Sequence, residues 1–141
     1  TAQALQTYRE SFRPSQWLEQ PYSMIGVPVI CAPTDDEAAY LSGPSAVSFV
    51  NLRQGRPIQM CSPEEAAAHE FTAMEREIVR GWHAPLVMGD PHQVRTQLGA
   101  LVDRFGVDEL MLTTMLYAQA DRLRSYELVA DAWDLSPAAA A

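Results

Sequence analysis

Residues 88–117 constrain the fold more than any other part of the chain, because they mark both ends of a helix and a strand that follows it. Asp90 can accept hydrogen bonds from the free amides of a first helical turn, and Pro91 lies where a missing N–H costs nothing. Gly106 suits the left-handed residue that ends a helix. Residues 110–112 are consecutively apolar, which predicts a strand covered on both faces. This order of elements indicates an α/β fold.

Residues 22–32 predict a second buried strand, after a first helix that ends before Pro14. Pro28 lies inside this strand and removes a donor from its hydrogen-bond ladder. Such a proline normally marks an edge strand or a bulge, and a sheet that is exposed on the Pro28 side would be consistent with it. Thr34 opens a predicted helix over residues 35–42, which the Gly43–Pro44 pair is expected to interrupt.

A helical insertion is predicted over about residues 53–84. Ser62 and Thr72 each begin a capping-box pattern, so each is expected to start a short helix. Residues 86–88 are expected to form a short extended return toward the helix that begins at Asp90. The insertion therefore lies between a strand and the helix that should cover it.

Four ordered blocks resemble the bacterial-luciferase-like flavin monooxygenases. The last helix–strand–helix segment of that family resembles Gly89-Asp90-Pro91 with Gly106-Val107-Asp108-Glu109, and the remaining blocks are residues 8–15, 22–32 and 120–128. The family fold is a (β/α)8 (TIM-type) barrel. The resemblance implies a partial barrel that holds the last two strands, numbers seven and eight, with a helical insertion between them.

The chain is too short for the complete fold that the resemblance implies. A full barrel takes about 250 residues, whereas this chain has 141. We expect residues 1–135 to be a single C-terminal fragment of a barrel domain and residues 136–141 to be a disordered tail. In the family, a Ser/Gly-rich turn and an Arg on earlier strands hold the flavin phosphate, and the chain shows no counterpart of either. The isolated fragment is thus expected to bind flavin weakly or not at all and to be inactive.

The resemblance also implies where ligands lie, because the carboxyl ends of barrel strands line the active site. The expected flavin contacts are small or apolar side chains, and the competing interpretation of them is barrel core. They are Ile30, Cys31, Ala32, Thr113, Thr114 and Met115. Arg53, Arg56 and His83 are candidates for contacts with the substrate or for the lid region. The competing interpretation of the two arginines is a solvated basic pair, and that of His83 is a packed or exposed lid residue. No catalytic residue is nominated.

Composition excludes several classes of function. The net charge of −8, with ten cationic side chains, provides no basic stripe for a nucleic acid. No apolar run reaches the roughly 20 residues that cross a bilayer, so a cytoplasmic protein is expected. No metal site is expected, because the three histidines are scattered and no Cys-x-x-Cys occurs. Cys31 and Cys61 are expected to be free thiols.

The leading hypothesis is a part of a luciferase-like oxidoreductase that uses reduced FMN and dioxygen on a small organic substrate. Two alternatives stay open at this point: a deazaflavin-dependent oxidoreductase of the same barrel family, and a non-enzymatic α/β dimerisation module. Open sheet edges are expected to pair with other strands. A homo-oligomer, or association with an N-terminal piece, is therefore expected.

Overall fold

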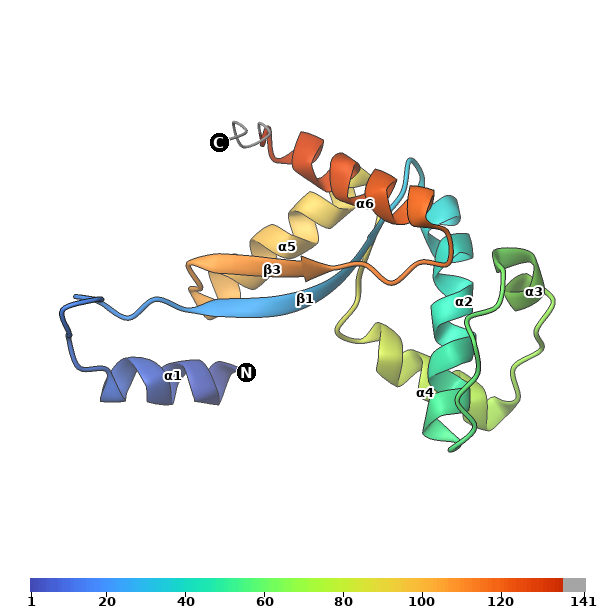
Figure 1. Ribbon diagram of the computed structural model, residues 1–141, viewed down its shortest axis with the longest axis horizontal. Helices are drawn as coiled ribbons and strands as arrows, with labels where there is room; N and C mark the ends of the chain where they lie inside the picture. The colour runs from blue at the N-terminus through green and yellow to red at the C-terminus, as the bar shows by residue number, and fades with distance from the viewer. Residues whose placement is uncertain (136–141) are drawn as a thin grey trace.

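The computed structural model describes residues 1–135 and shows three parallel strands and six helices. The tail predicted over residues 136–141 lies outside the described residues. The α/β class is confirmed (Figure 1). In chain order the elements are α1 (Ala2–Ser11), β1 (Met24–Cys31), α2 (Asp35–Arg53), α3 (Pro63–Ala67), α4 (Ala73–His83), β2 (Val87–Gly89), α5 (Pro91–Phe105), β3 (Glu109–Thr113) and α6 (Gln119–Ala132).

The sheet has the order β2-β1-β3, with β1 in the centre. β3 pairs with β1 from Met24 to Pro28, whereas β2 pairs only with Val29, Ile30 and Cys31. The expectation of two strands was too low, because the extended return is long enough to form ladder pairs with the end of β1. Residues 24–28 of β1 thus have no strand neighbour on the β2 side within residues 1–135.

Pro28 is tolerated in a central strand because of the side on which it lies. The Ala32 N–H donates to the Gly89 carbonyl at 3.2 Å, so even-numbered residues at this end of β1 direct their backbone groups toward β2. The missing N–H of Pro28 therefore faces the edge before β2 pairing begins at Val29. No bond to β3 is lost, so β1 is the central strand and not the edge strand that Pro28 normally marks, although the sheet is open beside Pro28 itself.

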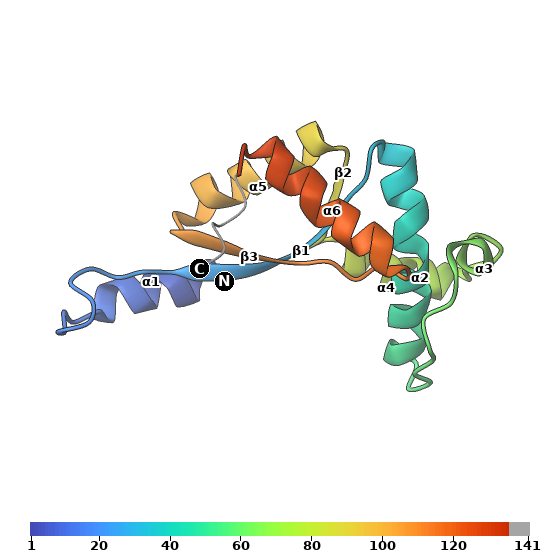
Figure 2. The same cartoon turned by 45° about the horizontal axis from the view of Figure 1, so that its top comes forward.

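Only one face of the sheet is fully covered by helices. α5 and α6 lie together on that face (Figures 1 and 2), where Val29 and Cys31 pack with Val94, Leu98 and Val129. On the opposite face a second cluster covers only the carboxyl end of β1, through α2. We call the rest of this face, which carries Met24, Gly26, Met111 and Thr113, the bare sheet face.

β3 shows this asymmetry most directly. Its residues alternate between exposed and half-buried, and Met111 is 51% exposed. The prediction that residues 110–112 are covered on both faces was wrong, because the helices cover only the face to which Leu110 and Leu112 contribute. Consecutive apolar residues do not reveal whether a second layer is present.

α2 runs through Gly43 and Pro44 without interruption, so the predicted break was wrong. Pro44 is fully buried, and packing around it holds the helix despite the missing hydrogen bond. Gly43 lies where α2 and α3 approach each other closely. A Cβ added there would lie 3.1 Å from the Ala66 Cβ of α3, which leaves little room for any side chain.

Four predicted helix starts and the predicted stop at Gly106 are confirmed. Thr34, Ser62, Thr72 and Asp90 each accept a hydrogen bond from an N–H in the first turn that follows. Gly106 ends α5 in the left-handed conformation, with φ of 58°. The small helices α3 and α4 thus lie between α2 and β2, where the helical insertion was predicted.

A polar cluster fastens the amino ends of β1 and β3. The Asp108 carboxylate accepts from the Ser23 N–H at 2.7 Å and from the Ser23 hydroxyl at 3.1 Å. The Arg9 guanidinium donates to the carbonyls of Phe105 and Gly106, both at 2.7 Å, which ties α1 to the end of α5. The Ser23 N–H bond, with help from Arg9, holds the pKa of Asp108 below its ordinary value.

The close approach at Gly43 leads to a prediction with a matched control. Gly99 lies inside α5 with nothing within 4 Å of an added Cβ. The variant Gly99→Ala is expected to stabilise the protein by up to about 1 kcal/mol, because alanine favours a helix over glycine. Gly43→Ala is expected to gain less or to destabilise. Urea unfolding of both variants measures the difference, and equal gains would contradict the close approach.

Candidate functional site

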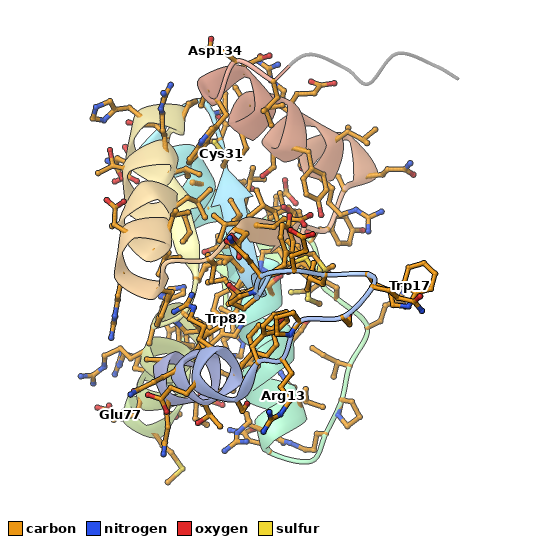
Figure 3. The ribbon with its side chains drawn as sticks, turned by 90° about the vertical axis from the view of Figure 1, so that its left-hand side faces the viewer. Arg13, Trp17, Cys31, Glu77, Trp82 and Asp134 are labelled. Carbon is orange, nitrogen blue, oxygen red and sulfur yellow. The ribbon has the colours of Figure 1, made fainter. Side chains whose placement is uncertain are left out.

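An apolar groove of about 430 Å³ lies near the carboxyl end of β3, between α2, α4 and the segment that joins α2 to α3. Met115, two residues beyond β3, lines it together with Trp82 of α4, which Figure 3 labels. We call it the α2 groove. Its lining residues are Ser45, Ser48, Phe49, Leu52, Pro57, Ile58, Met60, Trp82 and Met115.

One face of α2 supplies the floor of the α2 groove. Ser45, Ser48, Phe49 and Leu52 recur at the spacing that puts side chains on one side of a helix. The Ser45 hydroxyl donates to the Met115 carbonyl at 2.5 Å and so connects α2 to the end of β3. The Ser48 hydroxyl is buried and has no hydrogen-bond partner in the described part of the chain.

Aromatic side chains form the wall of the groove. The ring centroids of Phe49 and Trp82 lie 6.3 Å apart, and those of Trp82 and His83 lie 4.9 Å apart. Burial lowers the pKa of His83, and its buried Nε2 has no partner among residues 1–135. His83 is therefore a neutral packing residue behind the wall at neutral pH.

The expected flavin contacts at the end of β1 fall on two different faces. Ile30 and Ala32 pack with Ala38 and Leu116 on the α2 side of the sheet. Cys31 belongs to the core beneath α5 and α6 (Figure 3). Burial, followed by the negative charge of Asp90, raises the pKa of Cys31 to about 11. The structure thus brings Ile30 and Ala32 together and places Cys31 apart from them as an inert thiol.

The three expected contacts at the end of β3 also have different surroundings. Thr113 is exposed on the bare sheet face, and Met115 is 67% exposed in the groove. Thr114 is buried, and its hydroxyl donates to the Val29 carbonyl at 2.9 Å while its N–H donates to the Tyr126 hydroxyl at 3.0 Å. Thr114 is thus committed to holding β3 against β1 and α6.

Arg53 and Arg56 lie around the end of α2 and are both exposed. Arg56 donates to Gln54, and neither arginine lines the groove. Every residue that lines the groove is uncharged. The structure therefore does not bring the two arginines together with the strand ends.

Both cysteines are free, as expected. Residues 1–135 contain no group of three or more His, Cys, Asp or Glu side chains that could hold a metal ion. No helix in the same range is long and apolar enough to cross a membrane.

Of the residues that line the α2 groove, only Met115 was predicted from the sequence as a site residue. The helical spacing from Ser45 to Leu52 was visible, with two hydroxyls on an otherwise apolar face. The contribution of Ile58, Met60 and Trp82 was not visible, because it depends on how the insertion folds back against α2.

Comparison with known proteins supports the family resemblance. No family model matches the sequence. The chain is 31% identical over 129 residues to a luciferase-like monooxygenase of Escherichia coli, which covers 92% of this chain and 38% of that protein. It is 35% identical over 133 residues to the uncharacterized protein YvbT of Bacillus subtilis, covering 94% of this chain and 40% of YvbT. The chain spans about 40% of the length of these relatives.

The fold has a counterpart among solved structures. The crystal structure of apo-MsnO8 superimposes with a TM-score of 0.81 and 30% sequence identity. The match covers 97% of this chain and 42% of MsnO8. The arrangement of helices and strands described above is therefore shared over almost the whole chain.

The two neighbouring threonines give a prediction that separates a structural hydroxyl from a free one. Thr114→Val removes the donor to the Val29 carbonyl, and the free energy of unfolding is expected to fall by about 1–3 kcal/mol. Thr113→Val, on the bare sheet face, is expected to change it by less than about 0.5 kcal/mol. Denaturant unfolding measures both, and similar losses would show that the Thr114 bond is unimportant.

His83 gives a prediction about pH. Its folded pKa lies below the ordinary 6.5, so the unfolded chain binds more protons in mild acid, and His83 lowers stability as the pH falls below that value. His83→Phe should therefore lose less stability than the parent between about pH 7 and about pH 5. The control His92→Phe, at an exposed position of α5, should behave as the parent does. Parallel losses in all three proteins would contradict the buried neutral imidazole.

Proposed function

We propose that this chain forms part of a luciferase-like, flavin-dependent monooxygenase that uses reduced FMN and dioxygen on an organic substrate. The observation that carries the proposal is the charge-free α2 groove near the carboxyl end of a parallel strand. Ligands of parallel α/β folds bind at that end of the strands. Similarity to a luciferase-like monooxygenase of Escherichia coli supports the choice of chemistry.

The bare sheet face fits the interior of a (β/α)8 barrel. Met24 is 45% exposed there beside Met111, although both are apolar. Helices cover the other face, as they do on the outside of a barrel. The unpaired side of β1 and the outer edge of β3 would then pair with further strands, because open edges seek partners. Those strands belong to an N-terminal piece or to a second copy.

The residues present fit a flavin ring better than a flavin phosphate. Thr113 and Met115 are exposed and offer a small or apolar wall of the kind that packs against a flat ring, whereas Ile30 is buried beneath α2 and supports this wall from behind. Neither arginine near the insertion reaches this wall. When bound, reduced flavin supplies the electrons that activate dioxygen. The side chains of this chain would exclude water and orient the substrate beside the ring.

A domain exchange tests the proposal. The 129 residues of the Escherichia coli relative that match this chain are replaced by this chain, and FMN binding is followed by fluorescence. The chimera is expected to bind one FMN with an affinity within about tenfold of the intact relative, since the phosphate contacts lie outside the exchanged part. This chain alone is expected to bind FMN far more weakly.

Three results would overturn parts of the proposal. Micromolar binding of one FMN by this chain alone would contradict the missing phosphate contacts. A folded chimera that takes a deazaflavin in place of FMN would move the assignment to the deazaflavin-dependent relatives. A folded chimera that binds neither cofactor would favour the non-enzymatic dimerisation module.

A further inference from the structure

We infer that Tyr126 of α6 is a positioning residue of the candidate site. Its hydroxyl fixes Thr114, and with it the two neighbours Thr113 and Met115, which we call the ring wall. The inference rests on the proposed function, because the ring wall is the surface that we propose for the flavin. Tyr126 does not line the α2 groove, so it acts on the ring wall through Thr114.

The Thr114 N–H lies beyond the reach of the sheet. The ladder between β1 and β3 ends at the pair Pro28–Thr113. The Glu109 N–H donates to the Ser23 carbonyl, so odd-numbered residues of β3 direct their backbone groups toward β1 and even-numbered residues direct theirs toward the outer edge. The Thr114 N–H therefore faces the open edge of β3, where no strand of residues 1–135 accepts it. Thr114 is buried, so an amide without a partner would be costly there.

Side chains supply the hydrogen bonds that the ladder no longer provides. The Tyr126 hydroxyl accepts from the Thr114 N–H at 3.0 Å. The Thr114 hydroxyl donates in turn to the Val29 carbonyl at 2.9 Å, and the Met115 carbonyl accepts from Ser45. The segment is thus held from α6, β1 and α2 at the point where the chain leaves the sheet (Figure 1).

Ser125 determines where Tyr126 can reach. Its side chain is fully buried, and its hydroxyl accepts from the Cys31 N–H at 2.9 Å. One residue of α6 is therefore attached to the end of β1, and the next is attached to the segment beyond β3. This pair of bonds sets the separation of the two strand ends, and so the place of the ring wall relative to β1.

The exposure of Tyr126 separates this role from that of a core residue. Tyr126 is 42% exposed, whereas Leu128 and Val129 supply the contacts of α6 with the buried core. The variant Tyr126→Phe removes only the oxygen. It therefore leaves the core intact and frees the Thr114 N–H.

The first measurement uses the full chain without flavin and follows amide hydrogen exchange and the Met115 methyl resonance by NMR. Tyr126→Phe is expected to speed exchange of the Thr114 amide by about fivefold, the effect of one hydrogen bond, and to shift the Met115 methyl resonance. The matched control is Tyr8→Phe. The Tyr8 hydroxyl accepts from the Tyr22 N–H and donates to the Tyr22 carbonyl, both at 3.2 Å, before the amino end of β1. This control should leave Thr114 and Met115 unchanged.

The second measurement places both variants in the chimera with the Escherichia coli relative and titrates FMN. Tyr126→Phe should weaken FMN binding by about fivefold and change the visible absorption spectrum of the bound flavin, because the ring wall moves. Tyr8→Phe also loses backbone hydrogen bonds, yet it should change neither quantity. A general loss of stability would leave the spectrum of the bound flavin as it is.

Three outcomes would overturn the inference: unchanged exchange of the Thr114 amide in Tyr126→Phe, FMN binding by this variant equal to that of the parent chimera, or equal effects of the two tyrosine variants on FMN. A parent chimera that binds no FMN would instead contradict the proposed function. The exchange rates and the Met115 resonance would then decide alone whether Tyr126 holds the segment. Failure of one proposal is therefore distinguishable from failure of the other.

Discussion

The alternation of side chains along β1 determines what the rest of the structure can do. Val27, Val29 and Cys31 direct their side chains into the core beneath α5 and α6. Met24 and Ile30 lie on the other face, where only the carboxyl end is covered by α2. A strand with two apolar faces needs two layers, and this chain provides one complete layer and one short cover. The α2 groove lies beside that short cover, where α2 leaves the sheet.

The two ends of the sheet are built differently. At the amino ends, Ser23 and Asp108 exchange backbone and side-chain hydrogen bonds, and a carboxylate with a lowered pKa strengthens them. At the carboxyl ends, neutral hydroxyls of Ser45 and Thr114 make single bonds to carbonyls. Charge is therefore used where the sheet is fastened and is absent where the groove opens. This division follows the general separation of stability and activity between the two ends of parallel strands.

Sequence predicted the elements whose signals are local. The caps at Ser62, Thr72 and Asp90 and the left-handed Gly106 depend on a few neighbouring residues, and all appear as expected. The errors concern contacts between distant residues. Gly43 was taken as a helix stop, yet it makes room for Ala66 of α3. Residues 110–112 were taken as covered on both faces, since an apolar run carries no information about how many layers are present.

The candidate site shows the same limit at the level of single side chains. Chain position grouped Ile30, Cys31 and Ala32 as one wall, but strand alternation puts Cys31 on the opposite face from its two neighbours. Likewise Thr113 and Thr114 are adjacent in sequence, but the Thr113 side chain is exposed, whereas the buried Thr114 hydroxyl donates to the Val29 carbonyl. Met115 was predicted from its place after the strand, and it lines the groove. The aromatic wall required the insertion to fold back against α2, which no local pattern encodes.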